Sequence, residues 1–346
     1  MDDHAAFLAL PAKLYPKGSN PRNAATESEL LAGTHTLSRY FEIHTCTVAQ
    51  KGKTQARCAV TIYPDDNTAY LGFFDSIADA QVARELFGAA ENYLLGRGLH
   101  HIVGPVDASF WLGYRLKANR FNDAPYFGEP GGLPWYQGLW EQNGYAVTDV
   151  YHSHLFKAPS QKYVNQKYTD RLASFLEQGY RIESPSSKSW DKVIGEVYEL
   201  IMSLYHDFPV FKMIGEDDFR KHYSGLRQIM NFSMVKMAYY QDRAVGFYIS
   251  VPDYGHLLNQ PVNPAGLARI FWIKRHAPRY VMLYMGVDQQ HRGLGKAIAQ
   301  TIIDQVNLKK ALTIGALIHT GKDTERYVDD MIDERYRYLL FEKRLV

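Results

Sequence analysis

Polar and apolar residues alternate over much of the first quarter of the chain, and this period of two predicts β-strands with one buried face. Two such runs, at 41–50 and 56–63, are joined by Gln50-Lys51-Gly52-Lys53, a sequence suited to a tight hairpin turn. A further strand is predicted at 69–74, and the spacing of apolar residues predicts a helix at 77–97. The other elements expected in this half are a short helix at 27–32, a strand at 100–103, a helix at 135–143 and a strand at 145–155.

A polar segment at 157–170, which contains Pro159, separates these elements from a second series and is interpreted as a linker. We therefore expect two domains, residues 1–160 and 161–346. The second series is expected to comprise a strand at 179–183, helices at 189–206 and 215–229, a hairpin at 234–240 and 244–251, a proline-rich loop at 252–265, a strand at 280–287, a helix from residue 294, a strand at 312–319, a helix at 324–332 and a strand at 336–344.

The strand expected at 280–287 is followed by a glycine-containing loop, Gln290-His291-Arg292-Gly293-Leu294-Gly295, which leads into a helix with one apolar face. Glycine lets the backbone approach a ligand closely, and the first N–H groups of a helix have no partner within it. The helix dipole adds positive potential at the same place, so this helix start suits a pyrophosphate. On these features alone a dinucleotide-binding turn, a phosphate-binding nest and a plain tight connection all stay open.

The complete pattern is compatible with fewer families than the glycine loop alone. Gln290-x-x-Gly293-x-Gly295 follows a strand that ends Met285-Gly286-Val287-Asp288, and together they closely resemble the acyl-CoA-binding motif of the GNAT acyltransferase superfamily. The second glycine is not followed by the Lys-Ser or Lys-Thr pair of an ATP-binding P-loop, and a Rossmann fingerprint more often opens its domain. The order of elements over 175–346 is similar to that of a complete GNAT domain.

The first half, most clearly at 70–145, resembles the amino-terminal half of bacterial tandem-GNAT proteins, and Gly104-Pro105 and Pro134-Trp135-Tyr136 add to the likeness. Where an acyl-CoA loop would stand it has Phe73-Phe74-Asp75-Ser76, without the glycines. The resemblance implies an α/β fold with two tandem GNAT-like domains, each a mostly antiparallel central sheet flanked by helices. It also implies that the first domain is degenerate and that the second binds acyl-CoA.

For the donor site, the resemblance implies that strand 280–287 and the next strand splay apart and admit the pantetheine arm. Met285, Gly286 and Val287 would contact pantetheine through main-chain groups, and the Val287 N–H would meet the charge that develops on the thioester oxygen. The pyrophosphate would be held by Gln290, His291, Arg292, Gly293, Leu294, Gly295 and Lys296. Arg292 and Lys296 would add charge there, or they are solvated cations.

The reaction implied, attack of an amine on a thioester, needs a base for the ammonium and an acid for the thiolate. Many superfamily members use as the acid a tyrosine in the helix after the post-motif strand, where this sequence has Tyr327. The asparagine usual before that helix is absent, and Tyr327 is equally consistent with a packing residue. Tyr284 and His319 are the candidate bases because their strands border the cleft, with a structural histidine and water-mediated deprotonation as alternatives.

The composition of the chain is consistent with these expectations and adds others about its partners, its location and metal binding. The net charge is +2 over 346 residues, which predicts no general attraction to nucleic acid or to an anionic membrane. No apolar run approaches the roughly 20 residues of a membrane helix, and no hydrophobic signal segment follows Met1, so a cytoplasmic protein is expected. Cys46 and Cys58 are expected to be buried reduced thiols without the neighbours of a zinc ligand, so no metal is expected.

The predicted activity is N-acyl transfer, of an acyl group other than an aminoacyl group. The expected donor is acetyl-CoA or another acyl-CoA, and the expected acceptor is a small-molecule amine between the domains, where the aromatic segment 110–140 shapes its pocket. Two alternatives stay open. One is a tandem-GNAT transferase that acts on a peptide or uses aminoacyl-tRNA, which predicts a basic groove, and the other is an acyl-CoA-binding sensor without turnover.

Overall fold

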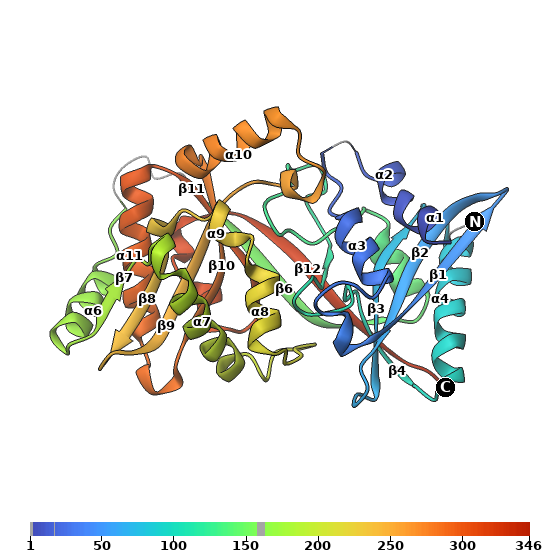
Figure 1. Cartoon of the computed structure of the whole chain (residues 1–346), viewed down its shortest axis with the longest axis horizontal. Helices are drawn as coiled ribbons and strands as arrows, with labels where there is room; N and C mark the ends of the chain where they lie inside the picture. Colours follow the sequence, from blue (N-terminus) through green and yellow to red (C-terminus); the bar gives the residue numbers. More distant parts are fainter. Residues whose placement is uncertain (1–2, 17, 158–162) are drawn as a thin grey trace.

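Residues 3–16, 18–157 and 163–346 are described by the computed structural model. Their strands form one continuous mixed sheet in the order β1-β2-β3-β4-β12-β6-β11-β10-β9-β8-β7, and β5 pairs with β12 beside this path. Figure 1 shows the sheet extending through the length of the molecule, with helices packed along it. The mixed α/β architecture expected from the sequence is thus confirmed.

The strands are β1 (Glu42–Gln50), β2 (Lys53–Ile62), β3 (Thr68–Ser76), β4 (His101–Gly104), β5 (Leu116–Lys117), β6 (Ala146–Phe156), β7 (Arg181–Glu183), β8 (Val235–Tyr240), β9 (Arg243–Pro252), β10 (Arg279–Val287), β11 (Leu312–His319) and β12 (Ile332–Arg344). The α-helices are α1 (Asp3–Ala9), α2 (Pro11–Leu14), α3 (Ala24–Leu31), α4 (Ala80–Gly96), α5 (Tyr136–Gln142), α6 (Gln166–Glu177), α7 (Trp190–Leu204), α8 (Glu216–Tyr223), α9 (Leu226–Ile229), α10 (Pro264–His276) and α11 (Leu294–Lys309). Most neighbouring strands are antiparallel, whereas β3 with β4 and β10 with β11 are parallel.

The final strand of the chain lies in the middle of the sheet, between β4 and β6. It pairs with β6 from Ile332–Phe156 to Glu342–Ala146, and its last residues also pair with β4. β6, the last strand of the first half, pairs in turn with β11 of the second half. The two halves therefore share strands across their border. The domain boundary near residue 160 stays a prediction, because residues 158–162, part of the segment interpreted as a linker, lie outside the described residues.

The elements predicted for 41–155 are present, with ends close to those expected. Helix α4 begins where the Asp79 side chain accepts two backbone hydrogen bonds, which satisfies N–H groups that have no partner within the helix. Cys46 and Cys58 lie opposite each other in β1 and β2. Both are free and buried, which confirms the prediction of buried reduced thiols.

The amino terminus is more ordered than the sequence predicts. One short helix is expected at 27–32, but α1, α2 and α3 all lie before residue 41. Residues of α1 and α3 contact the fully buried side chain of Arg57, whose guanidinium lies 2.6 Å from the Glu27 carboxylate and 2.9 Å from the Asp75 carboxylate. Arg22 reaches the same Asp75 carboxylate at 3.1 Å. Ion pairs between residues so far apart in the chain leave no periodic pattern in the sequence.

Two helices of the second half were missed. The segment interpreted as a linker, 157–170, contains the start of α6, which is capped by the Asn165 side chain. The proline-rich loop expected at 252–265 ends in α10, which begins at an Asn263 cap followed by proline. Both helices lie against α11 or the strands beside it, as Figure 1 shows.

Two predicted helices differ in form. The helix expected at 215–229 is divided into α8 and α9. The helix expected at 324–332 is replaced by two 3₁₀ turns, Asp323–Arg326 and Asp329–Met331. Val328, between the turns, has a left-handed backbone with φ of 50°, which a continuous right-handed helix cannot contain. Tyr327 therefore has an extended backbone, between the two turns, and is not part of a helix.

The aromatic segment after β4 joins the two halves. The Trp111 indole N–H donates to the Lys212 carbonyl oxygen (2.8 Å), and its ring packs edge-on against Phe211 and Phe219 of the second half. Trp111 itself is buried. The segment thus packs the core between the halves and also borders the cavity described below.

Candidate functional site

The strand before the glycine loop separates from its parallel neighbour. β10 and β11 pair only from Arg279–Leu312 to Met282–Gly315. Beyond this point residues 283–287 and 316–319 are unpaired with each other and line the two sides of a cavity. At the same level, the register of each strand with its other neighbour shifts. The splay implied by the resemblance is therefore present.

Main-chain groups of β10 face this gap. The Asp288 N–H donates to the Val245 carbonyl oxygen (2.9 Å), toward β9. Since successive backbone groups of a strand point to opposite sides, those of Met285 and Val287 point away from β9 and into the gap. The Tyr205 hydroxyl lies on that side, where it donates to the Met285 carbonyl oxygen (3.0 Å). The Val287 N–H thus has the orientation that a donor to a bound carbonyl oxygen needs.

The structure favours glycine at both positions of the loop, for different reasons. Gly293 has a left-handed backbone with φ of 90° where it begins α11. A Cβ atom on Gly295 would lie 2.8 Å from Met285 Cε and 2.9 Å from the Tyr327 hydroxyl oxygen. The start of α11 is therefore in close contact with β10 and with the turn that carries Tyr327.

The residues between β10 and α11 make contacts of their own. The Asp288 carboxylate accepts a hydrogen bond from the Gln290 N–H (3.0 Å), so Asp288 is a turn residue. The His291 Nδ1 is 2.6 Å from the Tyr180 hydroxyl, and its ring packs edge-on against Tyr180 and Tyr240. The Gln290 backbone N–H and the His291 ring are thus engaged within the protein, and the Lys296 N–H donates to the Gly293 carbonyl oxygen (3.2 Å). Among the described residues this leaves the N–H groups of Leu294 and Gly295 as the open donors at the start of α11.

Three cations surround the start of α11. Arg292 is exposed, and the Lys296 ammonium lies 6.0 Å from the centroid of the Tyr327 ring. Arg171 of α6 is the third, with its Nη1 3.3 Å from the position of a Cβ atom on Gly293. Sequence reasoning missed Arg171 because no element was predicted between the linker at 157–170 and the strand at 179–183.

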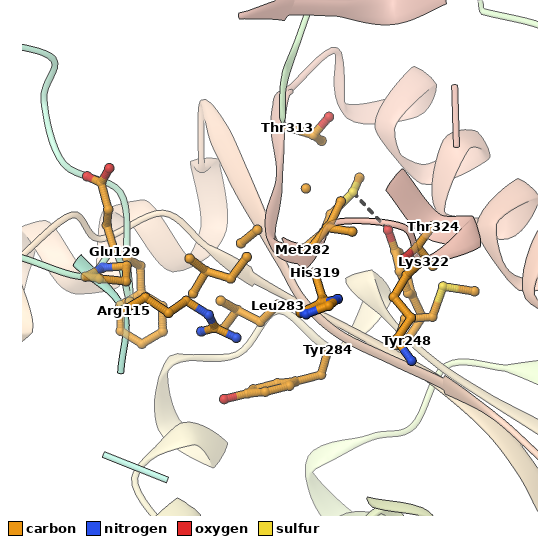
Figure 2. Close-up of a pocket in the computed structure, with 18 of the residues that line it drawn as sticks. Arg115, Glu129, Tyr248, Met282, Leu283, Tyr284, Thr313, His319, Lys322 and Thr324 are labelled. Carbon is orange, nitrogen blue, oxygen red and sulfur yellow. Dashed lines mark hydrogen bonds between the residues drawn. The ribbon is translucent and has the colours of Figure 1, made fainter. Parts of the chain in front are cut away.

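A cavity of about 850 Å³ runs along the gap and is lined from both halves. Figure 2 shows Arg115 and Glu129 of the first half and Met282, Tyr284 and His319 of the second half around this space. The predicted site residues that line it are Tyr284, Met285, Gly286, Val287, His319 and Tyr327. Gln289 lines the cavity, but the loop residues that come next, 290–296, are not among the described lining residues.

His319 is held by a carboxylate that the sequence did not single out. Its Nε2 lies 2.7 Å from an Asp149 carboxylate oxygen, and its ring packs edge-on against Tyr151. The Nδ1 is buried and has no hydrogen-bond partner among the described residues. With Nε2–H donated to Asp149, the lone pair of the neutral ring is on Nδ1, which can then accept a proton.

The two tyrosines proposed from the sequence lie in different surroundings. Tyr284 lies beside Tyr205 and Tyr223, and burial, with Tyr284 as a lesser cause, raises the pKa of both neighbouring phenols. Tyr327 packs edge-on against Tyr168 of α6 and lies at the loop end of the gap. The structure therefore brings His319, Tyr284 and Tyr327 to one cavity, with Tyr327 next to the glycine loop.

Two charged residues of the first half also reach the cavity without any sequence signal. The Arg115 guanidinium carbon lies 3.6 Å from the centroid of the Tyr114 ring and 4.0 Å from that of Tyr151. The Arg115 Nε is buried and has no partner among the described residues. Glu129 is buried beside Lys117, 2.9 Å away, and its burial raises the pKa of the Glu129 carboxyl.

Comparisons of sequence found two curated relatives, and no family model matches the chain. Protein YghO of Escherichia coli (strain K12) is 25% identical over 381 aligned positions, which cover 99% of this chain and 93% of that protein. The bacterial ceramide synthase of Caulobacter vibrioides (strain NA1000 / CB15N) is 25% identical over 281 positions, 77% of this chain and 72% of the synthase. In the described residues no helix has both the length and the apolar character needed to cross a bilayer.

Solved structures show the same architecture. A tandem GNAT protein from the clavulanic acid biosynthesis pathway matches with a TM-score of 0.55 and 11% identity, over 99% of this chain and 96% of that one. A GCN5-related glucosamine N-acetyltransferase region of a fungal β-N-acetylglucosaminidase matches with a TM-score of 0.55 and 15% identity, over 99% of this chain and 37% of the larger one. Together with the splayed strands and the glycine loop, these likenesses establish that the chain has the tandem GNAT fold.

Proposed function

We propose that this chain is an acyl-CoA-dependent N-acyltransferase. The observation that supports this most directly is the gap between β10 and β11, where backbone groups of Met285 and Val287 are turned toward a ligand space. The gap leads to the start of α11, whose open N–H groups and nearby Arg171, Arg292 and Lys296 suit a pyrophosphate. An extended thioester with a diphosphate at one end, as in acyl-CoA, fits this arrangement.

The chemistry proposed for the site assigns His319 as the base. Its Nδ1 takes a proton from the ammonium of the acceptor, and the free amine attacks the thioester carbonyl carbon. The carbon–nitrogen bond forms, the Val287 N–H donates to the carbonyl oxygen as it gains charge, and the carbon–sulfur bond then breaks. The nitrogen loses its second proton to solvent as the amide forms, and CoA leaves as the thiolate.

Tyr327 is assigned a different role from the acid expected at first. Its hydroxyl lies against Gly295, at the loop end of the gap, and its ring lies near Lys296 and Tyr168. There it is placed to contact the donor as the donor passes from the loop into the gap. We therefore propose that Tyr327 positions acyl-CoA and that the thiolate is protonated from solvent.

The substrates proposed are a long-chain acyl-CoA and an amine that carries a hydrocarbon chain. The cavity walls between the halves are largely aromatic and aliphatic, including Phe110, Phe208 and Leu226. A small, separate apolar pocket of about 40 Å³, bordered by residues of α7, shares Leu226 and Leu283 with the lining of this cavity. A ceramide is an amide of a fatty acid and a long-chain amino alcohol, and the bacterial ceramide synthase is similar to this chain.

Acyl transfer to a lipid amine is tested by product analysis. Purified protein is incubated with acetyl-, octanoyl- or palmitoyl-CoA and with sphinganine, spermidine or glucosamine, and amides are measured by mass spectrometry. We expect the amide of sphinganine with the longer acyl groups. Acetylation of the small amines alone would contradict the lipid substrates and favour the simpler expectation from the sequence.

Donor binding is tested separately by thermal shift with free CoA and the three acyl-CoAs. A ligand at about 100 times its Kd stabilises the folded state by about 2.7 kcal/mol, a shift that is easily measured. No stabilisation by any of these compounds would overturn the donor site. Stabilisation without any amide product would instead favour the acyl-CoA-binding sensor.

A further inference from the structure

Helix α10 presents large apolar side chains to solvent. Leu267, Phe271 and Trp272 are 50%, 60% and 56% exposed, although side chains of these types are usually buried. In Figure 1 the helix lies along one border of the molecule, above the ends of β10 and β11. Its outer side is thus covered by nothing among the described residues.

The inner side of α10 fixes its orientation. Ile273 is buried, and Ile270 packs beside it in a cluster that includes Ile302 and Val306 of α11. With about 100° between successive residues, Leu267, Phe271 and Trp272 then fall on the outer side. Arg275 projects between Phe271 and Trp272 in this arrangement. The apolar side chains therefore remain outward for as long as the helix is docked.

The charge around these side chains has one sign. Helix α10 carries Arg269, Lys274 and Arg275, and the sequence contains neither Asp nor Glu from 254 to 287. The overall net charge of +2 conceals this local excess. The Lys274 ammonium donates to the Gln228 carbonyl oxygen, which leaves Arg269 and Arg275 for the outer surface of the helix. We call these two arginines, with Leu267, Phe271 and Trp272, the α10 patch.

The end of α11 carries a similar group of side chains. The Leu312 N–H donates to the Pro278 carbonyl oxygen (2.9 Å), so the chain that leaves α11 lies against the chain that leaves α10. Just before it, Leu308 is 76% exposed and is followed by Lys309 and Lys310. The same combination of exposed apolar and basic side chains thus occurs on both helices where they meet.

We propose that the α10 patch docks onto the surface of an anionic phospholipid bilayer. Helices that lie in a membrane interface carry Trp, Phe and Leu toward the acyl chains and Lys or Arg toward the headgroups. Tryptophan is favoured at the headgroup level, and each cation near an anionic surface adds attraction. The charge of the patch complements such a surface, whereas a protein partner of neutral or basic surface would leave the cations unpaired.

The patch also adjoins two segments that line the cavity. Asn259, five residues before α10, lines it at one end, and Val306 and Asn307, just before Leu308, line it at another. Docking through the patch would hold these borders of the cavity close to the lipid surface. A substrate with a hydrocarbon chain could then pass between bilayer and cavity, although the docking itself does not depend on the proposed reaction.

The test is binding of the full chain to vesicles in a flotation assay, without acyl-CoA. Vesicles containing about a third phosphatidylglycerol are compared with pure phosphatidylcholine vesicles. We expect binding to the anionic vesicles that weakens as NaCl rises to about 0.5 M, because salt screens the cations. The fluorescence of Trp272 should shift to shorter wavelength on binding, and Trp272→Phe should remove most of that shift.

Variants distinguish docking through the α10 patch from nonspecific adsorption to vesicles. Phe271→Ser with Trp272→Ser is expected to weaken vesicle binding at least tenfold, and Arg275→Gln about fivefold, since a cation near the surface contributes about 1 kcal/mol. Leu176→Ser on α6 is the matched control, because Leu176 is 48% exposed but lies outside the patch, and it should bind as the parent chain does. Unfolding midpoints should be unchanged, since all these side chains are exposed.

Two results would overturn the proposal. One is absence of binding to anionic vesicles, or binding that the patch variants leave unchanged. The other is a dimer in analytical ultracentrifugation that the Phe271→Ser, Trp272→Ser chain no longer forms, which would assign the patch to a second copy of the chain.

Discussion

The pairing of His319 with Asp149 gives the first prediction at the level of single residues. In His319→Gln the side chain can no longer take up a proton, and kcat for N-acyl transfer should fall about 10²- to 10⁴-fold. Acyl-CoA binding, measured by thermal shift, should be unchanged, because His319 is not among the donor contacts proposed here. Asp149→Asn should have a smaller effect on kcat, since it leaves the ring in place but weakens its orientation.

His152 of β6, the strand that pairs with β11, provides the control. His152 also pairs with a carboxylate, Glu325, at 3.0 Å, but it does not line the cavity among the described residues. His152→Gln should therefore retain the parent kcat. Full activity of His319→Gln would remove His319 from the mechanism and support deprotonation of the amine by water.

A second prediction concerns pH and the buried His154. This residue is fully buried in β6, neither ring nitrogen has a partner among the described residues, and burial, with Arg335 as a further cause, lowers its pKa to about 4. The unfolded chain takes up a proton near pH 6.5, whereas the folded chain does so only near pH 4. The free energy of unfolding should therefore fall as the pH is lowered from 6.5 to 4, by up to about 3 kcal/mol from this group.

Urea unfolding at several pH values measures this effect. His154→Gln cannot be protonated, so the difference between the parent and the variant should shrink as the pH is lowered through that range. His222 has a similarly lowered pKa, from burial, and leaves part of the slope in the variant. An identical pH slope in parent and variant would contradict the assignment of the slope to His154.

At the level of elements, α6 supplies a prediction about the donor site. Its Arg171 lies next to Gly293, where the pyrophosphate is proposed to bind. Arg171→Gln should raise the Kd for CoA about three- to tenfold, since a charge-assisted contact to phosphate is lost. Lys167→Gln, on the same helix, is the charge-matched control, and isothermal titration measures both. Equal Kd values for the two variants would exclude Arg171 from the site.

The same helix shows why the sequence predicted only part of the fold. The strand, loop and helix at 280–309 are local patterns, namely a continuous apolar and aromatic run, glycines and a period of four, and each was predicted correctly. Helix α6 has an apolar stripe of Tyr168, Leu172 and Phe175, but its first residues lie in the polar segment interpreted as a linker. Helix α10 is apolar on both sides and so lacks the single stripe that identifies an amphipathic helix. Their caps, Asn165 and Asn263, were the signals available.

The candidate site, like the fold, was predictable only where it depends on a local sequence pattern. Backbone contacts of β10 and the glycine loop follow from a contiguous motif, and His319 was found because it ends the next strand. Asp149, Arg115 and Arg171 come from other parts of the chain, and only the folded protein brings them to His319, to the cavity and to Gly293, respectively. No spacing in the sequence indicates such contacts, because strand order is set by pairing between distant segments.

At the level of the whole molecule, the exchange of strands between the halves determines how the protein unfolds. β12 belongs to the second half by sequence but lies between β4 and β6, and β6 lies between β12 and β11. Neither half alone can complete its sheet. Exposed strand edges and lost core, including Leu339 and Phe341 of β12, would leave either fragment without a stable structure.

We therefore predict that the full chain unfolds in one cooperative transition. Urea curves followed by far-UV circular dichroism and by tryptophan fluorescence should coincide, because Trp111 and Trp140 report on the first half and Trp190 on the second. A chain that ends at residue 331 lacks β12 and should show no cooperative transition, although it retains every residue of the proposed donor loop. Two separate transitions in the full chain, or cooperative unfolding of the truncated chain, would mean that the halves fold independently and that β12 only joins them.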